Sequence, residues 1–115
     1  MRILVCEPQA EVRELLRHVV ERLGHEPVFP EKLAGAEDVD VVLLEPADPV
    51  ALSTATSLLR RRPGLPVVCA SIHPDSAETA GLRPLASLVK PFGLSELERA
   101  LTAAVSTVTA PGRAA

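Results

Sequence analysis

Five short aliphatic runs alternate along the chain with longer segments in which apolar residues recur every three or four positions. Short apolar runs bounded by turn signals are typical of buried parallel strands, whereas the wider spacing is typical of helices with one buried face. The predicted strands span residues 2–7, 25–30, 39–45, 65–71 and 86–89. The second run contains Pro27 and Pro30, which lack the backbone N–H of a central strand, so we predict an edge strand there.

The apolar spacing also predicts four helices. They span residues 11–23, 50–61, 76–80 and 94–108. Asp75 or Ser76 is expected to cap the short third helix, and Ser95 followed by Glu98 predicts a capping box at the start of the last one. The polar segment 30–40 leaves room for only a turn or two of helix.

Strands that alternate with helices predict right-handed crossovers and a parallel sheet covered on both faces. The expected fold is therefore a three-layer, doubly wound α/β domain. The chain has 115 residues, which fits one domain, predicted at residues 1–110, followed by a disordered tail at residues 111–115.

The composition argues against several classes of function. The net charge is −3 and the chain has no Trp or Tyr, which is unfavourable for nucleic-acid binding, and we interpret the basic run 60–62 as a solvated helix end. No apolar run approaches the ~18 residues of a membrane span, so we expect a cytoplasmic protein without membrane contact. Cys6 and Cys69 lie in aliphatic runs, as structural thiols do, and the three histidines lack metal-ligand spacing.

Polar side chains end four of the predicted strands. They are Glu7, Glu45, Ser71 and Lys90. Ligands of doubly wound sheets bind beyond the carboxyl ends of the strands, so these residues define the candidate site. The competing interpretation is that the two glutamates are solvated carboxylates and that the lysine is an exposed surface cation.

The motifs, taken in order, resemble those of a known family. ILVCEP followed by EVRELL, then VDVVLLEP, LPVVCAS and LVKPF are similar to segments of the receiver domains of bacterial response regulators. The resemblance covers residues 2 to about 108, and its most specific part is Lys90-Pro91-Phe92. It implies a flavodoxin-like sheet with strand order 2-1-3-4-5, and it makes Pro91 a candidate for a cis peptide bond. Short connections around residues 39–45 and before Lys90 predict that the second and fourth helices of the family are reduced.

The resemblance also exposes departures at the functional positions. Family members place two acids after the first strand to help hold magnesium, an aspartate that accepts phosphate after the third, a hydroxyl after the fourth and a lysine after the fifth. Here these positions carry Glu7 and Pro8, Glu45, Ser71 and Lys90, respectively. The extra methylene of Glu45 moves its carboxylate by roughly 1.5 Å, where an error of ~1 Å can cost ~100-fold in rate.

These departures predict an atypical receiver domain that is not an enzyme and that signals by protein interaction without phosphorylation. Glu45 is expected to pair with Lys90 and to reach toward Ser71, in partial imitation of a phosphorylated aspartate. Neither a metal nor another cofactor is expected, because one carboxylate is missing and Glu7, Glu45 and Lys90 leave about one excess negative charge. Ser87 replaces the aromatic residue that the family often carries on the fifth strand.

The expected partner is a signalling or effector protein, with a histidine kinase among the candidates, docked around the last strand and the helices. A homodimer is left open. Two alternatives remain: a phosphorylatable, magnesium-dependent receiver of a histidine kinase, and a small-ligand sensor whose pocket is lined by Glu7, Pro8, Glu45 and Ser71.

Overall fold

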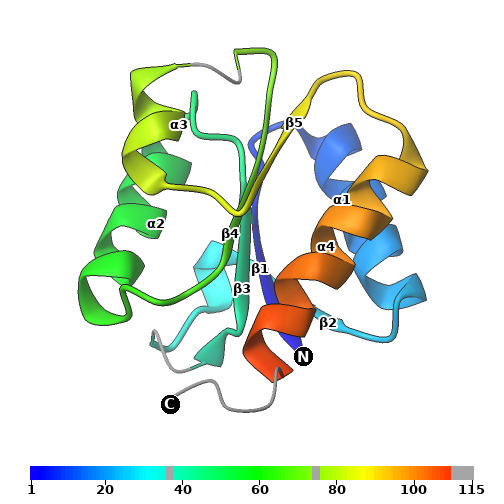
Figure 1. Ribbon diagram of the computed structural model, residues 1–115, viewed down its shortest axis with the longest axis horizontal. Helices are drawn as coiled ribbons and strands as arrows, with labels where there is room; N and C mark the ends of the chain where they lie inside the picture. The colour runs from blue at the N-terminus through cyan, green and yellow to red at the C-terminus, as the bar shows by residue number, and fades with distance from the viewer. Residues whose placement is uncertain (36–37, 74–75, 110–115) are drawn as a thin grey trace.

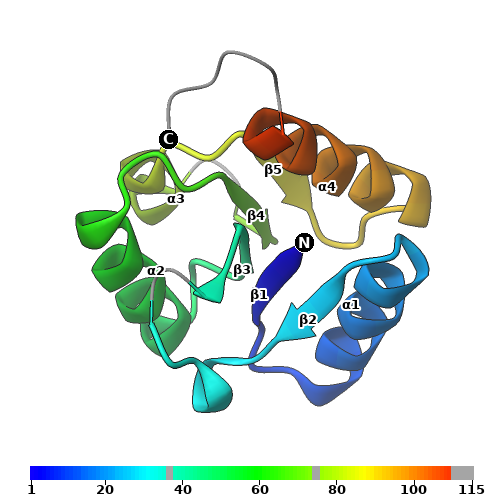
Figure 2. The same cartoon turned by 90° about the horizontal axis from the view of Figure 1, so that it is seen from below.

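The computed structural model describes residues 1–35, 38–73 and 76–109, which form a five-stranded parallel sheet between two layers of helices (Figures 1 and 2). The predicted tail at residues 111–115 lies outside this range, as does Asp75. The elements in chain order are β1 (Arg2–Cys6), α1 (Ala10–Arg22), β2 (Glu26–Val28), the 3-10 turn η1 (Pro30–Lys32), β3 (Val41–Leu44), α2 (Pro49–Arg61), β4 (Val67–Ser71), α3 (Ala77–Leu82), β5 (Ala86–Val89) and α4 (Leu94–Thr109). None of the helices in these ranges is long and apolar enough to span a membrane.

The strand order is β2-β1-β3-β4-β5 and every neighbouring pair is parallel, which confirms the predicted doubly wound fold. The three-residue 3-10 turn η1 stands where the second helix of the family would lie, and α3 has only six residues. Both predicted reductions are therefore observed. The helices α1 and α4 cover one face of the sheet, and α2 and α3 cover the other (Figure 2).

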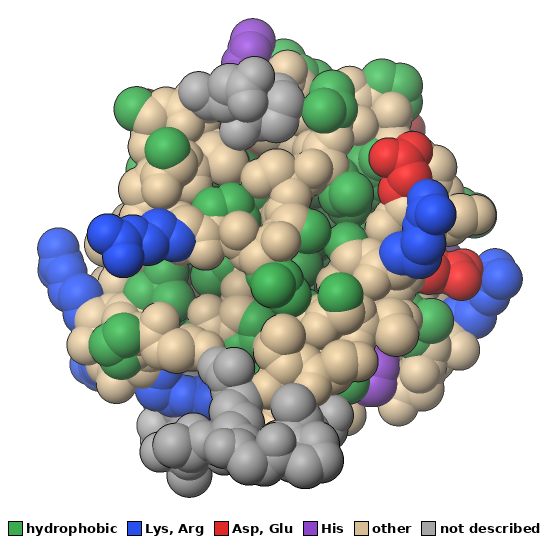
Figure 3. Space-filling view, viewed as in Figure 1, with side chains coloured by type: hydrophobic (Ala, Val, Ile, Leu, Met, Phe, Trp, Pro, Cys, Tyr) green, Lys and Arg blue, Asp and Glu red, His purple; other side chains and the backbone are tan. Residues whose placement is uncertain are grey.

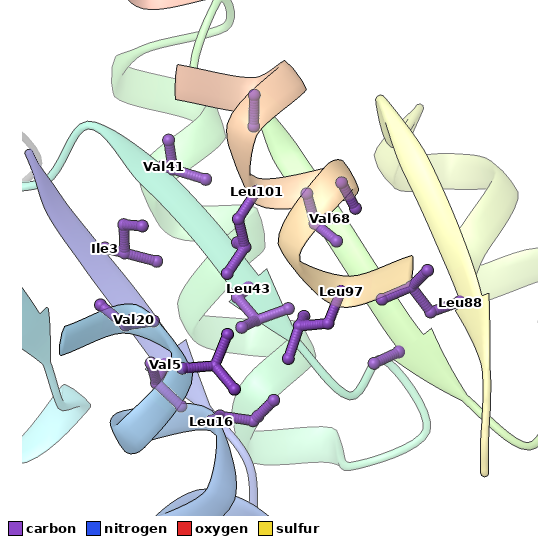
Figure 4. Packing of buried hydrophobic residues seen from close by; sticks show 14 residues of the cluster. Ile3, Val5, Leu16, Val20, Val41, Leu43, Val68, Leu88, Leu97 and Leu101 are labelled. Carbon is purple, nitrogen blue, oxygen red and sulfur yellow. The ribbon is translucent and has the colours of Figure 1, made fainter. Parts of the chain in front are cut away.

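Aliphatic side chains fill both interfaces between the sheet and the helices. Alternate strand residues point to opposite faces, so Val5 packs on the α1 and α4 side while Cys6 packs on the α2 and α3 side. Figure 4 shows the first of these interfaces, where Leu97 and Leu101 of α4 lie over strand residues that include Leu43. These contacts anchor the strands whose ends carry the candidate site.

The helix N-termini correct one prediction. Glu96, and not Glu98, closes the turn before α4, because its Oε1 accepts the N–H of Gly93 at 3.2 Å. The Ser95–Glu98 capping box is therefore wrong: the helix begins at Leu94, two residues earlier than that pair requires, and Glu98 forms an ion pair with Arg22 at 3.4 Å. Ser76 caps α3 as predicted, accepting the N–H of Thr79 at 3.2 Å.

The basic run at the end of α2 is only partly a solvated helix end. Arg60 and Arg61 are exposed, but Nη1 of Arg62 donates to the carbonyl oxygen of Val39 at 2.5 Å. The contact arises because α2 returns the chain to the edge of the sheet where β3 begins. Arg62 thus ties the end of this helix to the segment that enters the central strand.

Candidate functional site

Two glutamates and a lysine meet at the carboxyl edge of the sheet. Glu7 follows β1, Glu45 follows β3 and Lys90 follows β5, so parallel strand direction brings all three to the same edge. Nζ of Lys90 lies 2.5 Å from Oε1 of Glu7 and 3.2 Å from Oε1 of Glu45. One ammonium therefore bridges two carboxylates whose positions are 38 residues apart in sequence.

All three side chains are largely withdrawn from solvent. Their exposed fractions are 2% for Glu7, 11% for Glu45 and 14% for Lys90. The interpretation of these groups as solvated surface charges is therefore wrong. Burial weakens screening by salt and strengthens charge–charge interactions, so the position of each side chain depends on the other two.

The second oxygen of each carboxylate is held by the backbone. Oε2 of Glu7 accepts the N–H of Gln9 at 3.1 Å, and Oε2 of Glu45 accepts the N–H of Ala47 at 3.2 Å. Both glutamates precede a proline, which has no N–H, so the first amide available after each glutamate lies two residues on. The ends of β1 and β3 therefore form the same kind of turn, Glu-Pro-x, in which the glutamate carboxylate accepts the N–H of the third residue.

Ser71 makes the corresponding turn at the end of β4. Its Oγ accepts the N–H of His73 at 3.1 Å, and the residue is buried. In the described part of the chain no hydrogen bond joins Ser71 to Glu45, so the predicted reach of that carboxylate toward the hydroxyl is not observed. The reason is local: Lys90 and the Ala47 amide hold the Glu45 carboxylate, and the His73 amide holds the Ser71 hydroxyl.

The two prolines of the candidate site lie at its rim. Pro8 is exposed and contributes no polar side-chain atom to the carboxylates beside it. The Lys90–Pro91 peptide bond is cis, at the corner where the chain leaves β5.

An open hollow of about 290 Å³ lies beside the acidic cluster. Glu7 and Pro8 line it, but Glu45 and Ser71 do not, so the structure does not form the ligand pocket that the sequence predicted. The other lining residues include Arg13, which pairs with Glu31 and lies 4.1 Å above the Phe29 ring. This hollow therefore opens between α1, η1 and the start of α2.

The donor set does not fit a divalent cation. Magnesium requires oxygen ligands in a near-octahedral arrangement, usually one or two carboxylates that are free to bind it together with water or phosphate oxygens. Glu7 and Glu45 share one ammonium and each binds a backbone amide, while Pro8 offers no side-chain oxygen. Within the described ranges, no group of three or more His, Cys, Asp or Glu residues could hold a metal ion.

Two buried thiols lie behind this edge. Burial raises the pKa of the Cys6 thiol to about 12, and the Asp48 carboxylate adds to the effect. Burial raises the pKa of the Cys69 thiol to about 11, and the Glu45 carboxylate contributes there. Both residues pair in register with Leu44 of β3, one on each side, and both are free, as expected for structural thiols.

The backbone amides of the site were missed by reasoning from sequence, although a signal for two of them existed. The dipeptide Glu-Pro occurs after both central apolar runs, at residues 7–8 and 45–46. Since a proline removes the first amide, the repeated dipeptide could have predicted that the following N–H binds the glutamate. The His73 amide had no comparable signal.

Solved structures with a similar fold include receiver domains. The non-phosphorylated receiver domain of HemR from Leptospira biflexa is 22% identical, with a TM-score of 0.79, covering 91% of this chain and 94% of that one. The response regulator TrrA from Thermotoga maritima, in complex with Mg²⁺ and BeF, is 22% identical with a TM-score of 0.70 and coverages of 90% and 97%. The receiver domain of a sensor histidine kinase from Pseudomonas aeruginosa PAO1, with a magnesium ion in its active-site cleft, is 18% identical with a TM-score of 0.67 and coverages of 91% and 97%.

No protein-family model and no curated protein matches the sequence. The structural comparisons therefore establish the fold of the chain but not its function. Evidence for the function comes from the residues at the carboxyl edge of its sheet.

Replacing Lys90 should destabilise the protein strongly. Lys90→Met preserves the length of the side chain but leaves two buried carboxylates without their cation, a loss of about 3–5 kcal/mol in the free energy of unfolding. Lys32→Met, at an exposed position of η1, is the matched control and should change stability by less than about 0.5 kcal/mol. Urea unfolding followed by circular dichroism at pH 7 measures both, and equal stability of the two variants would contradict the described role of Lys90.

The two native thiols should be unreactive in the folded protein. At pH 8 we expect a disulfide reagent to label neither Cys6 nor Cys69 until urea unfolds the chain, because the reactive thiolate is not formed in the fold. Above the ordinary thiol pKa of 9.0, the unfolded chain releases protons that the folded chain retains, so stability should fall as pH rises from about 9. The exposed Ser53→Cys variant should react at once, and stoichiometric labelling of the folded native chain at pH 8 would contradict the expectation.

Proposed function

We propose that this chain is an atypical receiver domain of two-component signalling that acts by binding a protein partner and does not accept a phosphoryl group. The fold supports the receiver assignment. The cluster of Glu7, Glu45 and Lys90 supports the absence of phosphotransfer, because the Lys90 ammonium neutralises the carboxylates in place of a metal ion.

One observation carries the proposal: the ammonium of Lys90 contacts both carboxylates at once. A hard metal ion at this place would have to displace the ammonium from two buried partners. Two carboxylates against one lysine leave an excess charge of about −1, which the backbone amides of Gln9 and Ala47 further offset. The cluster therefore does not need a divalent ion to be tolerated.

The geometry of Glu45 is also unfavourable for accepting phosphate. A nucleophilic carboxylate oxygen must face the phosphoryl donor in line, and errors of ~1 Å are costly. Oε1 of Glu45 binds Lys90 and Oε2 binds the Ala47 amide, so each oxygen already has a partner. This arrangement supports a cluster of Glu7, Glu45 and Lys90 that stays in one state. The domain would then signal through a docking surface that is always present.

The molecule offers an apolar surface near the last strand and helix, where a partner is expected. An open hollow of about 360 Å³ is lined mainly by apolar residues of α1, the end of β4 and the corner after β5. Leu15, 41% exposed, and Ile72, 61% exposed, line this hollow together, and a contiguous apolar patch of this kind is typical of a contact site. A signalling protein, such as a histidine kinase or an effector, is the proposed occupant.

A small-ligand sensor is the second candidate. The hollow of about 290 Å³ beside Glu7 and Pro8 supports it, since it occupies the position left by the missing second acid. Charged groups of both signs surround this hollow, so a zwitterionic metabolite would suit it. A rise in melting temperature with added metabolite would favour this candidate over protein docking.

Incubation with acetyl phosphate and Mg²⁺, followed by intact-mass measurement, tests the proposal. The native chain should gain no phosphoryl mass. The matched variant Pro8→Asp/Glu45→Asp restores the second acid and the shorter acceptor, and it should gain a magnesium-dependent adduct. A stoichiometric, magnesium-dependent adduct on the native chain would overturn the proposal and support the phosphorylatable alternative.

A further inference from the structure

A separate hollow lies along the flank of α2, where the short η1 leaves the helix uncovered. Its volume is about 330 Å³, and it opens between α2 and the segment at residues 33–35 that follows η1. Volumes of about 300–1,000 Å³ are typical of sites for small molecules. Neither the Lys90 cluster nor the hollow near Ile72 shares a lining residue with it, so an inference drawn from it is independent of the proposed function.

The exposed face of α2 is unusual among the helices of this protein. From Pro49 to Leu59 the helix has no charged residue, although Ser53 and Ser57 are exposed. The exposed positions of α1, by contrast, include Glu11 and Glu14. A helix face that is in contact with water usually carries charges. The middle of the α2 face instead offers hydroxyl groups.

The hydroxyl groups of α2 differ in whether they already have a partner. Those of Thr54 and Thr56 donate to carbonyl oxygens one turn earlier in the helix, at 2.9 Å and 2.7 Å. In the described part of the chain no hydrogen bond holds the hydroxyl of Ser53 or that of Ser57. Both serines line the hollow, so two hydroxyl donors are available to a ligand there.

Arg61 supplies the positive charge of the hollow. It follows Ser57 by one helical turn and Ser53 by two, and helical side chains lean toward the N-terminus, which brings its guanidinium toward the same face. Among the residues that the structure describes, Arg61 has no ion pair and no Asp or Glu lines the hollow. The full charges of Arg60 and Arg61 exceed the partial charge of about −0.5 at the end of a helix, so this place favours an anion.

The surface on this side of the molecule is also positive. In Figure 3, which has the view of Figure 1, the Asp and Glu side chains that can be seen lie on the side of α4, whereas the acidic or basic side chains seen on the side of α2 and α3 are Lys or Arg. Lys32 is a further exposed cation, directly before the wall at residues 33–35. A region with one sign of charge raises the local concentration of ligands of the opposite sign.

The rest of the hollow is mainly apolar. Leu33 and Ala34 line it from the segment after η1, and Leu58 lines it from α2. Sites for small molecules commonly combine an apolar wall, which packs against the body of the ligand, with a few polar groups that fix its orientation. The hollow has both parts.

We propose that this hollow binds a phosphate monoester that carries a small apolar body. The guanidinium of Arg61 donates to phosphate oxygens as a fork, and the hydroxyls of Ser53 and Ser57 each donate one hydrogen bond. A phosphate monoester has three terminal oxygens that point in different directions, one for each of these groups, whereas a carboxylate has two. The apolar body packs against Leu33 and Leu58.

Titration with phenyl phosphate, followed through the backbone amide NMR shifts of Ser53, Ser57 and Arg61, tests the site. The shifts should saturate with a dissociation constant of about 1 mM or tighter. Benzoate keeps the ring but has two oxygens, and inorganic phosphate lacks the ring, so each should bind at least about fivefold more weakly. Phenyl phosphate without saturable shifts, or equal affinity for either comparison ligand, would overturn the proposal.

Two neighbouring arginines distinguish a site from general attraction of an anion. Arg61→Gln should weaken the binding of phenyl phosphate by at least about tenfold, because it removes the charged donor of the hollow. Arg60→Gln removes the same charge from a residue that does not line the hollow, and it should weaken binding by less than about threefold. Both arginines are exposed, so both variants should keep the native circular dichroism. Equal weakening by the two variants would overturn the site.

Discussion

The arrangement of the carboxyl edge of the sheet depends on one buried ammonium, that of Lys90, which contacts the carboxylates of both Glu7 and Glu45. Removing Lys90, Glu7 and Glu45 from water costs several kcal/mol for each charge, and their mutual attraction offsets that cost only when the geometry is good. The short contact from Lys90 to Glu7 and the backbone amides on the remaining carboxylate oxygens provide that geometry. The cluster is therefore better understood as fixing one arrangement of three loops than as a source of net stability.

The topology of the sheet brings this cluster together. Crossover connections return each strand to the same starting edge, so residues that end β1, β3 and β5 converge although they are far apart in the chain. The Glu-Pro-x turns then direct the first two carboxylates, because proline leaves the amide two residues on as the first donor. Lys90 approaches from β5, two strands away from β3 in the order of the sheet, and its long side chain spans that distance over β4.

The sequence alone predicted the framework of this molecule well, because apolar periodicity reflects burial directly. The strands, the strand order implied by the resemblance, and the reduced second and fourth helices are all observed. The contacts of short polar side chains were harder to predict. Ser71 binds the His73 amide and not the Glu45 carboxylate, and Glu96, not the predicted Ser95–Glu98 pair, closes the turn before α4, because these contacts depend on how the backbone turns after each strand.

The direct test of the central claim is a magnesium titration observed through the backbone amides of Gln9 and Ala47. These two N–H groups bind the carboxylates that a metal ion would have to recruit, so their NMR chemical shifts report its arrival. If the Lys90 ammonium takes the place of a metal ion between Glu7 and Glu45, both chemical shifts remain unchanged up to millimolar Mg²⁺. Saturable, magnesium-dependent shifts at both amides would contradict the account.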